Sequence, residues 1–280
     1  MYLDDACYVP KDDLDVILLL GVDKFLSQSQ DESYNNSQQT DFMMLLVMDR
    51  RNETCTALHL NRDTMAEIPV LGVRGEQAGT ITGQLALAHT YGSGRLDSCR
   101  NAVKAVSDLL YGVKIDHFAA FTMDAVAQIN DLAGGVTVTV LGDLSSVSPQ
   151  MVEGTSLILT GDMALSYVRT RYGLEDSSNL RRMERQRQYL EGLRDQLSAK
   201  MKFDNSFLLD VLEKISPYMT SDCTINQLSQ LYDHWELYAD GGIRIIDGEA
   251  KVGAEYMEFY PDEAALKRLV VDLFYVPLEE

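Results

Sequence analysis

Two continuous apolar runs of strand length lie near the start of the chain. The first covers residues 15–23, DVILLLGVD, and the second covers residues 41–49, DFMMLLVMD. Short apolar runs bounded by polar residues are typical of strands buried on both faces. Residues 49–52 then predict a turn, and residues 53–60 alternate in polarity as a half-buried strand does. The second run and residues 53–60 therefore predict an antiparallel hairpin.

The rest of the chain alternates between helical and strand patterns. We expect helices at residues 82–91, 98–111, 124–132, 205–215, 226–238 and 261–274, and strands at 117–122, 136–140, 242–247 and 255–260. Strands that alternate with helices indicate an α/β or α+β domain whose helices pack on a sheet. We divide the chain into a frayed lead-in (1–13), a main domain (14–199) and a C-terminal α/β extension that packs on it (200–280).

A polar Ser/Gln/Asn segment without periodicity, residues 24–40, separates the first two strands. It is too long for an ordinary connection, so it is a functional flap or a disordered loop. Asp23 precedes this segment and Asp41 follows it. If the two strands are neighbours, both carboxylates meet at one edge of the sheet, where they can hold Mg²⁺ together with phosphate oxygens. The alternative is that both aspartates are ordinary turn residues.

Arginines concentrate in one short stretch of an otherwise acidic chain, residues 160–188. A helix at the start of this stretch should end near Val168, so that Arg169 and Arg171 project together from extended chain. On the following helix Arg182, Arg185 and Gln186 share one flank. Guanidinium groups are suited to binding phosphate oxygens, and the two segments can converge on one anion. The alternative is a solvated basic face paired with Glu175, Glu184 and Glu191.

A third polar feature, Arg62-Asp63, comes directly after a predicted strand, where ligands of sheet proteins tend to bind. A surface ion pair is the plainer interpretation. Together, however, the acidic pair, the arginines and the long adjacent loop fit phosphoryl transfer. Catalysis of that reaction consists mostly of positioning and charge neutralisation.

The composition of the chain further limits the partners and metal sites that we expect. The chain has 24 Lys+Arg against 43 Asp+Glu, a formal net charge of −19, which argues against general nucleic-acid binding. No apolar run approaches the roughly 20 residues that cross a bilayer. The four cysteines (Cys7, Cys55, Cys99, Cys223) form no CxxC, so we expect no zinc site from them. Their spacing does not decide whether two of them form a disulfide. The four histidines (His59, His89, His117, His234) show no ligand spacing and are expected in the core or on the surface.

Several motifs, in order and spacing, resemble the LytR–CpsA–Psr family over about residues 14–197. They read GVD, TDFMMLLVMD, NRDT, YGVKIDHFAAFTMD, AGGVTVTV, LTGDMALSYVRTR and RMERQRQ. The resemblance implies a layered α/β fold, with a central mixed sheet, helices on both sides and an apolar tunnel for a lipid tail. The region after Lys200 resembles, less specifically, the C-terminal extension of clostridial-type members.

The resemblance implies an Mg²⁺-dependent phosphotransferase on the extracytoplasmic face of the cell membrane. Such enzymes move a glycopolymer or teichoic-acid-like chain from a polyprenyl-pyrophosphate carrier onto peptidoglycan, forming a phosphodiester. Members have an N-terminal membrane helix. This sequence begins without one, so we expect a soluble extracytoplasmic domain whose anchor lies outside the sequence given. No nucleic-acid partner is expected.

Motif by motif, the resemblance also implies the site. Asp23 and Asp41 correspond to the magnesium ligands. Pyrophosphate binding falls to Arg62, Arg169, Arg171, Arg182, Arg185 and Gln186, and the catalytic group comprises Asp41, Arg62, Asp63, Arg169 and Arg171. We expect Asp63, or the aspartate that does not bind metal, to take the proton of the acceptor hydroxyl.

The sequence departs from the family pattern at several positions. Gln39 replaces an arginine, Asn61 replaces a proline, Asn179 replaces an aspartate, and the lysine-containing KIN motif reads Thr80-Ile81-Thr82. Lys24 and Arg181 are candidates to compensate for the lost cations. These departures keep two alternatives open: a pyrophosphatase that uses water as acceptor, and a non-catalytic module that binds polyprenyl phosphate or glycan.

Overall fold

The computed structural model describes residues 1–23, 39–72, 74–170, 179–204 and 206–278. The contacts within the chain divide it into two compact units. Unit 1 comprises Met1–Ala120 and Ser221–Glu280, and unit 2 comprises Phe121–Thr220. The chain thus leaves unit 1 once and returns to it. These units differ in extent from the predicted division at residues 13 and 199.

Unit 1 contains most of the strands. Its first part holds β1 (Tyr2–Leu3), β2 (Ala6–Pro10), β3 (Leu14–Val22), β4 (Thr40–Asp49), β5 (Thr54–His59), β6 (Met65–Leu71), β7 (Gln77–Gln84), a 3₁₀ turn η3 (Leu85–Leu87), α1 (Arg95–Leu109) and the start of β8 (His117–Thr122). After the return of the chain it holds α6 (Ile225–Leu237), β12 (Ala239–Ile245), β13 (Gly248–Val252), β14 (Met257–Pro261), α7 (Glu263–Phe274) and β15 (Tyr275–Pro277).

A six-stranded sheet in the order β11-β8-β3-β4-β5-β12 is the main layer of the fold. The apolar runs of β3 and β4 form its middle, and Leu18, Leu20, Met43 and Leu45 have no exposed surface. Burial of such runs from both faces explains why they lack polar alternation. β3, β4 and β5 are antiparallel and β12 joins β5 in parallel, so the sheet is mixed, as expected.

The core of unit 1 lies between this sheet and its helices. α1 contributes Cys99, Ala102, Ala105 and Val106, which recur at helical spacing and are fully buried. Asn101 ties the same helix to neighbouring backbone by donating to Pro69 O at 2.8 Å and to Ala88 O at 2.7 Å. All four cysteines are free thiols, which answers the question of a disulfide.

Unit 2 is mainly helical. It holds α2 (Met123–Ala133), β9 (Val136–Thr139), β10 (Ser156–Leu159), α3 (Asp162–Arg169), α4 (Asn179–Met201), α5 (Phe207–Ile215) and η4 (Ser216–Tyr218), and β11 (Met219–Ser221) leads back to unit 1. Gly134 ends α2 in the left-handed conformation at φ 87°, which glycine adopts without steric cost. A separate core contains Val136, Leu159 and Tyr167.

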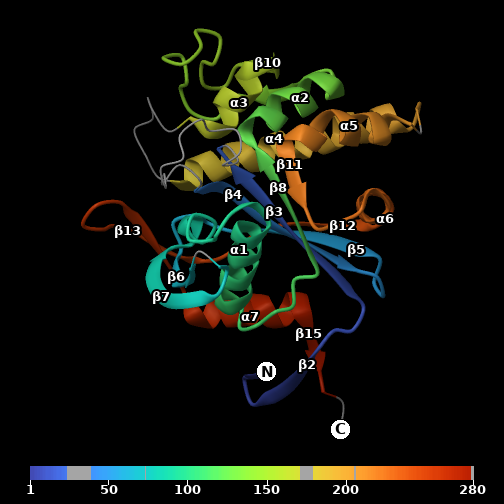
Figure 1. The fold of residues 1–280 in the computed structure, drawn as a ribbon. Helices are drawn as coiled ribbons and strands as arrows, with labels where there is room; N and C mark the ends of the chain where they lie inside the picture. The colour runs from blue at the N-terminus through green and yellow to red at the C-terminus, as the bar shows by residue number, and fades with distance from the viewer. Residues whose placement is uncertain (24–38, 73, 171–178, 205, 279–280) are drawn as a thin grey trace. The chain divides into compact units, whose positions relative to one another are not determined.

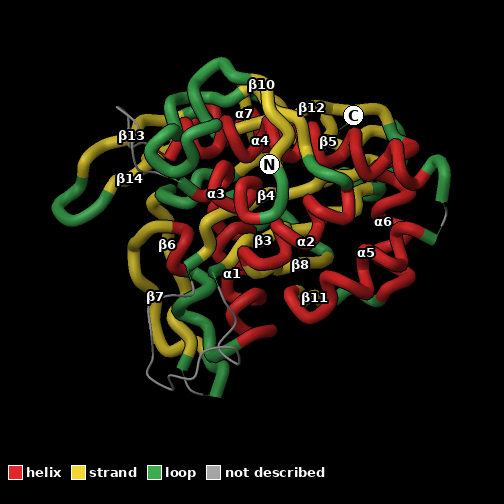
Figure 2. Tube along the Cα trace, turned by 90° about the horizontal axis from the view of Figure 1, so that it is seen from above, coloured by secondary structure: helices red, strands yellow, loops and turns green. Residues whose placement is uncertain are grey.

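Some local predictions are wrong. Residues 1–13 are not a frayed lead-in, because β2 pairs with β15 at the other end of the sequence (Figure 1). Residues 82–91 are not a helix: β7 extends to Gln84 and only a 3₁₀ turn follows. In both places strand pairing overrides the local pattern, with the distant β15 in the first case and with the preceding strand β6 in the second. The sequence pattern also misses β6, β10 and β13; β13, whose residues are all exposed, pairs with β14 as a hairpin (Figure 2).

The family resemblance also leads to expectations about a membrane helix, a lipid tunnel and the overall architecture. Within the described ranges, none of the helices is both long and apolar enough to cross a bilayer. The apolar tunnel implied by the family resemblance stays a prediction. The expected mixed α/β architecture is confirmed.

Candidate functional site

The loop that follows β5, Asn61–Thr64, is fixed by its own first residue. Asn61 Oδ1 accepts from the backbone N–H of Asp63 at 2.9 Å, and Asn61 O accepts from Thr64 Oγ1 at 2.6 Å. A side-chain amide that bonds backbone two residues ahead forms an Asx turn, which sets the chain direction locally. Asn61 therefore provides a rigid turn at the position where the family has proline.

Arg62 is buried in this loop with only 8% of its surface exposed. Its Nη1 forms an ion pair with Asp41 Oδ1, its Nη2 donates to Gln39 Oε1, and its Nε lies 3.5 Å from Asp63 Oδ1. A buried guanidinium requires acceptors for its N–H groups, and this cluster supplies two hydrogen-bond acceptors, Asp41 and Gln39, while Asp63 contributes its charge near Nε. The predicted catalytic residues Asp41, Arg62 and Asp63 are thus in one place. We call Gln39, Asp41, Arg62 and Asp63 the acidic cluster.

Asp41 owes its position to an irregularity between β3 and β4. Gly21 pairs with Phe42, and the next pair is Val22 with Thr40, so Asp41 is the extra residue of a β-bulge. Bulges change the direction of a side chain relative to a regular strand. Asp23 follows Val22 directly and is half-buried. The prediction that both aspartates lie at the same end of neighbouring strands is confirmed for their backbone positions.

Gln84 is a member of the site that sequence analysis missed. Its Nε2 donates to Asp63 Oδ1 at 3.0 Å and to Met257 O at 2.7 Å. The backbone of the same segment contributes too, because Phe259 N donates to Asp63 O at 2.9 Å. Asp63 is therefore held by β7 and β14. No local pattern reveals this arrangement, because the bond from Gln84 to Met257 O joins residues 173 positions apart.

In unit 2, three predicted phosphate-binding residues lie on one buried flank of α4. Arg182, Arg185 and Gln186 are 2%, 0% and 6% exposed. The alternative of a solvated basic face is therefore wrong for these residues. Their shared flank, predicted from helical spacing, is confirmed.

The C-terminal end of α3 explains why these polar residues are inside. Arg185 Nε donates to Tyr167 O at 2.9 Å, Arg185 Nη2 donates to Thr170 O, and Gln186 Nε2 donates to Val168 O at 3.2 Å. The last carbonyls of a helix have no partners within that helix and carry partial negative charge. α4 thus caps α3 with side chains.

Arg185 keeps its positive charge without a carboxylate partner among the described residues. Its Cζ lies 5.9 Å from the centre of the Tyr167 ring, and its Nη1 is a buried donor that no described residue accepts. Burial lowers the pKa of Arg185, and burial raises the pKa of the Tyr167 hydroxyl. Guanidinium groups nevertheless stay protonated in proteins, so this is a buried cation with a donor to spare.

The remaining predicted residues have mixed outcomes. Arg182 Nη2 donates to Asn179 Oδ1 at 2.5 Å, so the asparagine at this family position contacts the arginine directly. Arg169 is exposed and is the last residue of α3, which corrects the prediction that it lies in extended chain. The backbone hydrogen bond from Thr170 N to Ser166 O carries the helix further than the sequence suggests. Arg171 and Lys24 lie outside the described residues.

The acidic cluster belongs to unit 1, and Arg169, Arg182, Arg185 and Gln186 belong to unit 2. Convergence of the two groups on one anion stays a prediction, because each group is described within its own unit. Thr80-Ile81-Thr82, at the KIN position, lies in β7, in the hairpin with β6.

Comparison with known proteins identifies relatives. The polyisoprenyl-teichoic acid–peptidoglycan teichoic acid transferase TagU of Halalkalibacterium halodurans is 29% identical over 178 residues, 63% of this chain and 51% of the relative. The TagU of Bacillus cereus strain ATCC 14579 is 25% identical over 265 residues, 94% of this chain and 78% of the relative. The matched part thus spans about half the length of the first relative.

Among solved structures, that of TagT bound to LI-WTA is similar to this chain with a TM-score of 0.69. It is 19% identical, and the match covers 94% of this chain and 90% of that one. At this identity the likeness establishes the fold. The sequence model of the LytR_cpsA_psr family matches residues 6–267, which is nearly the whole chain. The chain therefore belongs to the LytR_cpsA_psr family.

Proposed function

We propose that this chain is a phosphotransferase that moves a teichoic-acid-like polymer from a polyisoprenyl-pyrophosphate carrier onto peptidoglycan. Its relatives are named as transferases of this kind, and a solved structure of similar fold, TagT, holds LI-WTA. The reaction takes place on the extracytoplasmic face of the membrane, where peptidoglycan is. The observation that carries the proposal is Arg62, buried between Asp41 and Asp63 in a chain of this family.

The bonds that change are those around one phosphorus atom. The oxygen of an acceptor hydroxyl bonds to the phosphorus that bears the glycan. The bond from that phosphorus to the bridging oxygen breaks, and polyisoprenyl phosphate leaves. Arg62 binds the diphosphate oxygens and offsets their growing charge. Asp63 takes the hydroxyl proton, and Gln84 holds its carboxylate in place.

The carboxylates at the ends of β3 and β4 fit a magnesium ion. Asp23 and Asp41, which lie at the same end of neighbouring strands, would supply hard oxygen ligands of the kind that Mg²⁺ prefers. When bound, Mg²⁺ would neutralise part of the charge of the diphosphate. Asp41 would then have two roles, since it also holds the Arg62 guanidinium.

The arginine helix of unit 2 supports anion binding separately. Arg185 is a buried cation balanced by neutral carbonyls, so an anion would be its first full countercharge among the described residues. Arg182 and Gln186 lie on the same flank of α4 as Arg185. The exposed Arg169 is the last residue of the preceding helix, α3. We propose these residues, with Arg171, as phosphate ligands.

The test compares two arginines of the same unit. Arg62→Ala and Arg62→Lys are assayed with a polyprenyl-pyrophosphate glycan and an oligosaccharide acceptor, with Arg100→Ala as control. Arg100 is exposed on α1 and pairs with Asp97. Turnover should fall on the order of 10²–10³-fold in both Arg62 variants, because lysine lacks the planar fork. Turnover by folded Arg62→Ala equal to that of Arg100→Ala would exclude the proposal.

A non-catalytic binding module is the second candidate. Gln39, present instead of an arginine, accepts from Arg62 Nη2 and so occupies a donor that a diphosphate needs. This candidate predicts retention of the lipid-linked glycan without turnover. Assays with and without acceptor separate all three cases. A phosphodiester product indicates the transferase, release of glycan phosphate without acceptor indicates the pyrophosphatase, and unchanged substrate indicates the binding module.

A further inference from the structure

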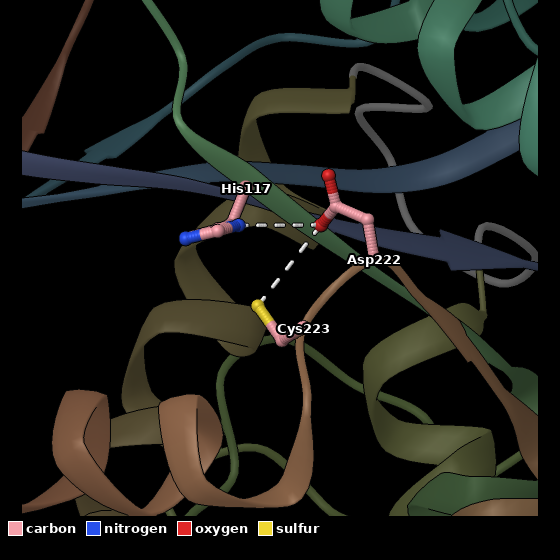
Figure 3. A group of neighbouring side chains, drawn as sticks. All are labelled: His117, Asp222 and Cys223. Atoms are coloured by element: carbon pink, nitrogen blue, oxygen red, sulfur yellow. Dashed lines mark hydrogen bonds and ion pairs between the residues drawn. The ribbon is translucent and has the colours of Figure 1, made fainter.

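A cluster of three side chains lies in unit 1 away from the acidic cluster. His117 begins β8, and Asp222 and Cys223 connect β11 to α6 (Figure 3). One nitrogen, oxygen or sulfur atom from each of the three residues lies within 4.8 Å of the others. In the part of the chain that the structure describes, these residues form the one group of three or more such ligands. We call His117, Asp222 and Cys223 the His-Asp-Cys cluster.

The distances in this cluster are close to those around a tetrahedral ion. His117 Nδ1 lies 3.6 Å from Asp222 Oδ1, and Cys223 Sγ lies 4.0 Å from the same oxygen. Ordinary zinc bonds at tetrahedral angles would place nitrogen and oxygen about 3.4 Å apart, and sulfur and oxygen about 3.6 Å apart. These two separations are therefore longer than the ideal ones by about 0.2 Å and about 0.4 Å, and the imidazole and thiol lie within 4.8 Å of each other.

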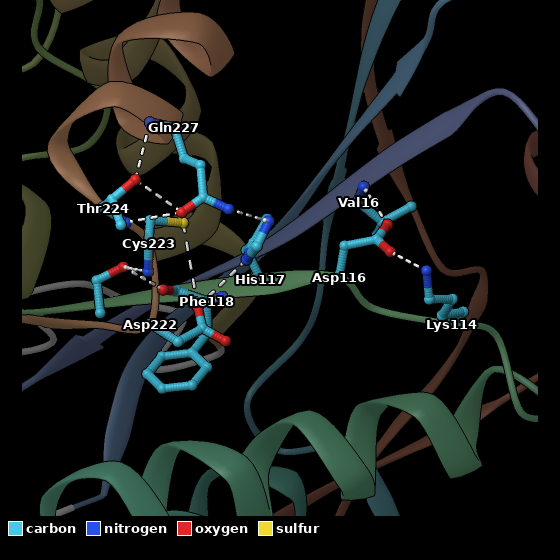
Figure 4. Close-up of polar contacts among 10 residues, drawn as sticks. Val16, Lys114, Asp116, His117, Phe118, Asp222, Cys223, Thr224 and Gln227 are labelled. Atoms are coloured by element: carbon cyan, nitrogen blue, oxygen red, sulfur yellow. Dashed lines mark hydrogen bonds and ion pairs between the residues drawn. The ribbon is translucent and has the colours of Figure 1, made fainter.

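The backbone around the ligands is already held in place. Phe118 N donates to Asp222 Oδ1 at 2.9 Å, Ser221 Oγ donates to Phe118 O at 2.6 Å, and Cys223 N donates to Ser221 Oγ at 3.0 Å (Figure 4). These bonds fix the segment before α6 on β8 without using the thiol or the imidazole ring. Preorganised ligands lose little conformational entropy when an ion binds.

We propose that the His-Asp-Cys cluster binds zinc(II), with water in the fourth position, and thereby joins α6 to β8. Imidazole, thiolate and carboxylate are the ligand types of zinc sites. A sulfur ligand disfavours Mg²⁺, so this site is chemically separate from the one proposed at Asp23 and Asp41. The proposal is independent of the transferase activity.

A reactive cysteine is the main alternative interpretation, and the surroundings of Cys223 argue against it. Burial raises the pKa of the Cys223 thiol, and the nearby Asp222 carboxylate raises it further, although a hydrogen bond with Ser221 acts in the opposite direction. The thiol is therefore not activated as a nucleophile. A divalent cation would remove the repulsion between thiolate and carboxylate, and its binding would release the thiol proton.

Gln227 on α6 determines which ring nitrogen of His117 carries the proton. Gln227 Oε1 accepts from Thr224 N at 2.9 Å and from Thr224 Oγ1 at 2.8 Å, so its amide nitrogen faces His117 Nε2 at 3.3 Å (Figure 4). In this arrangement His117 Nε2 accepts, and Nδ1 carries the ring proton toward Asp222. Zinc on Nδ1 displaces that proton and leaves Nε2 protonated opposite the amide, which weakens binding.

This contact gives the proposal a test in which affinity should rise. Gln227→Glu keeps a side-chain acceptor for Thr224 N, as the capping box at the start of α6 requires. It also offers a carboxylate to His117 Nε2–H, the usual outer partner of a metal-bound histidine. We expect zinc affinity to increase on the order of 10-fold.

The site would cross-link distant parts of the sequence. Phe118, the neighbour of His117, and the ligand Asp222 are 104 residues apart in the sequence. Between them the chain leaves unit 1 and returns to it. Closing a long loop costs the unfolded chain more entropy than closing a short one. Zinc at about 100 times its dissociation constant should raise the melting temperature on the order of 5 °C.

The experiment titrates the full chain with Zn²⁺ by calorimetry and with Co²⁺ by absorption. One equivalent of Zn²⁺ should bind, and Co²⁺ should produce a thiolate-to-cobalt charge-transfer band. Cys223→Ser should abolish the band and weaken Zn²⁺ binding at least about 100-fold, whereas Cys7→Ser, at an exposed free cysteine, should change neither. Asp222→Asn, which keeps the acceptor for Phe118 N, should weaken binding with the fold retained.

Three results would overturn the proposal. They are absence of stoichiometric Zn²⁺ binding, a cobalt band that persists in Cys223→Ser, and Zn²⁺ affinity that is unchanged or lower in Gln227→Glu. Because the titration measures binding of the metal alone, failure here leaves the transferase proposal intact, and loss of transferase activity leaves this one intact.

Discussion

The two units bury arginine in opposite ways. In unit 1, Arg62 contacts the carboxylates of Asp41 and Asp63. In unit 2, Arg185 contacts backbone carbonyls and an aromatic ring, with no carboxylate among the described residues. A charge paired with opposite charge is largely cancelled, whereas one solvated by dipoles remains available. The first arrangement suits a preorganised reaction centre, and the second suits an anion site.

Loss of Arg62 should have the largest effect on stability. Arg62→Met leaves the buried carboxylate of Asp63 and the partly buried carboxylate of Asp41 without their cation, and should lower the free energy of unfolding by about 3–5 kcal/mol. Urea denaturation of the full chain measures this difference. Arg100→Met is the exposed control and should change the free energy by less than about 0.5 kcal/mol. A similar cost in both variants would mean that the acidic cluster is solvated.

Loss of Arg185 should have a smaller effect on stability. Arg185→Met leaves neutral carbonyls, those of Tyr167 and Thr170, so the expected cost is about 1–3 kcal/mol. Arg181, on the exposed face of the same helix, provides the control. If Arg185→Met were as costly as Arg62→Met, the contrast between paired and dipole-solvated arginine would be wrong.

The Asp41–Arg62 pair should show direct coupling. If the charges stabilise each other, the cost of Arg62→Met should fall by about 1–3 kcal/mol when Asp41 is already asparagine. A double-mutant cycle of the two single variants and the double variant, by urea denaturation, measures the coupling. Additive costs would indicate that the close approach of these two side chains has no energetic consequence.

Loss of the hydrogen bond from Gln84 to Asp63 should have an effect on stability comparable to loss of Arg185. Gln84→Met removes the donor to Asp63 Oδ1 and should cost about 1.5–3 kcal/mol, because the acceptor is a charged group. Transferase activity should fall more than binding of the lipid-linked glycan, since Gln84 positions a catalytic group. Equal losses of binding and turnover would show that Gln84 is only structural.

Asp49, at the turn between β4 and β5, gives the smallest predicted effect. Burial tends to raise the pKa of the Asp49 carboxyl, but hydrogen bonds from Asn52 and the ion pair with Lys11 outweigh it and leave the pKa lowered. A lowered pKa in the folded state stabilises the protein above the unfolded pKa of about 3.9, and this contribution is lost as pH falls below that value.

The variant Asp49→Asn should therefore narrow the difference in stability between pH 6 and pH 3 relative to the unmodified chain. Urea denaturation at both values measures this. If Asp49→Asn leaves the difference in stability between pH 6 and pH 3 unchanged, other carboxylates cause the loss of stability in acid, including those that contact Arg62.

Some of this protein could be read directly from its sequence. The apolar runs of β3 and β4 and the hairpin to β5 follow from patterns of burial within a few residues. Helical spacing likewise places Arg182, Arg185 and Gln186 on one flank. The resemblance to the family identifies Asp41, Arg62 and Asp63 as candidate catalytic residues.

Only the tertiary structure decides which polar groups meet. That the arginine flank of α4 faces inward depends on the unpaired carbonyls of α3, and Gln84 reaches Asp63 only because β7 and β14 flank the same loop. His117 and Cys223 have no ligand spacing in the sequence, yet the pairing of β8 with β11 brings them together. Periodicity encodes burial of nearby residues, but partners more than a hundred residues apart are selected by the packing of the whole chain, which no local pattern records.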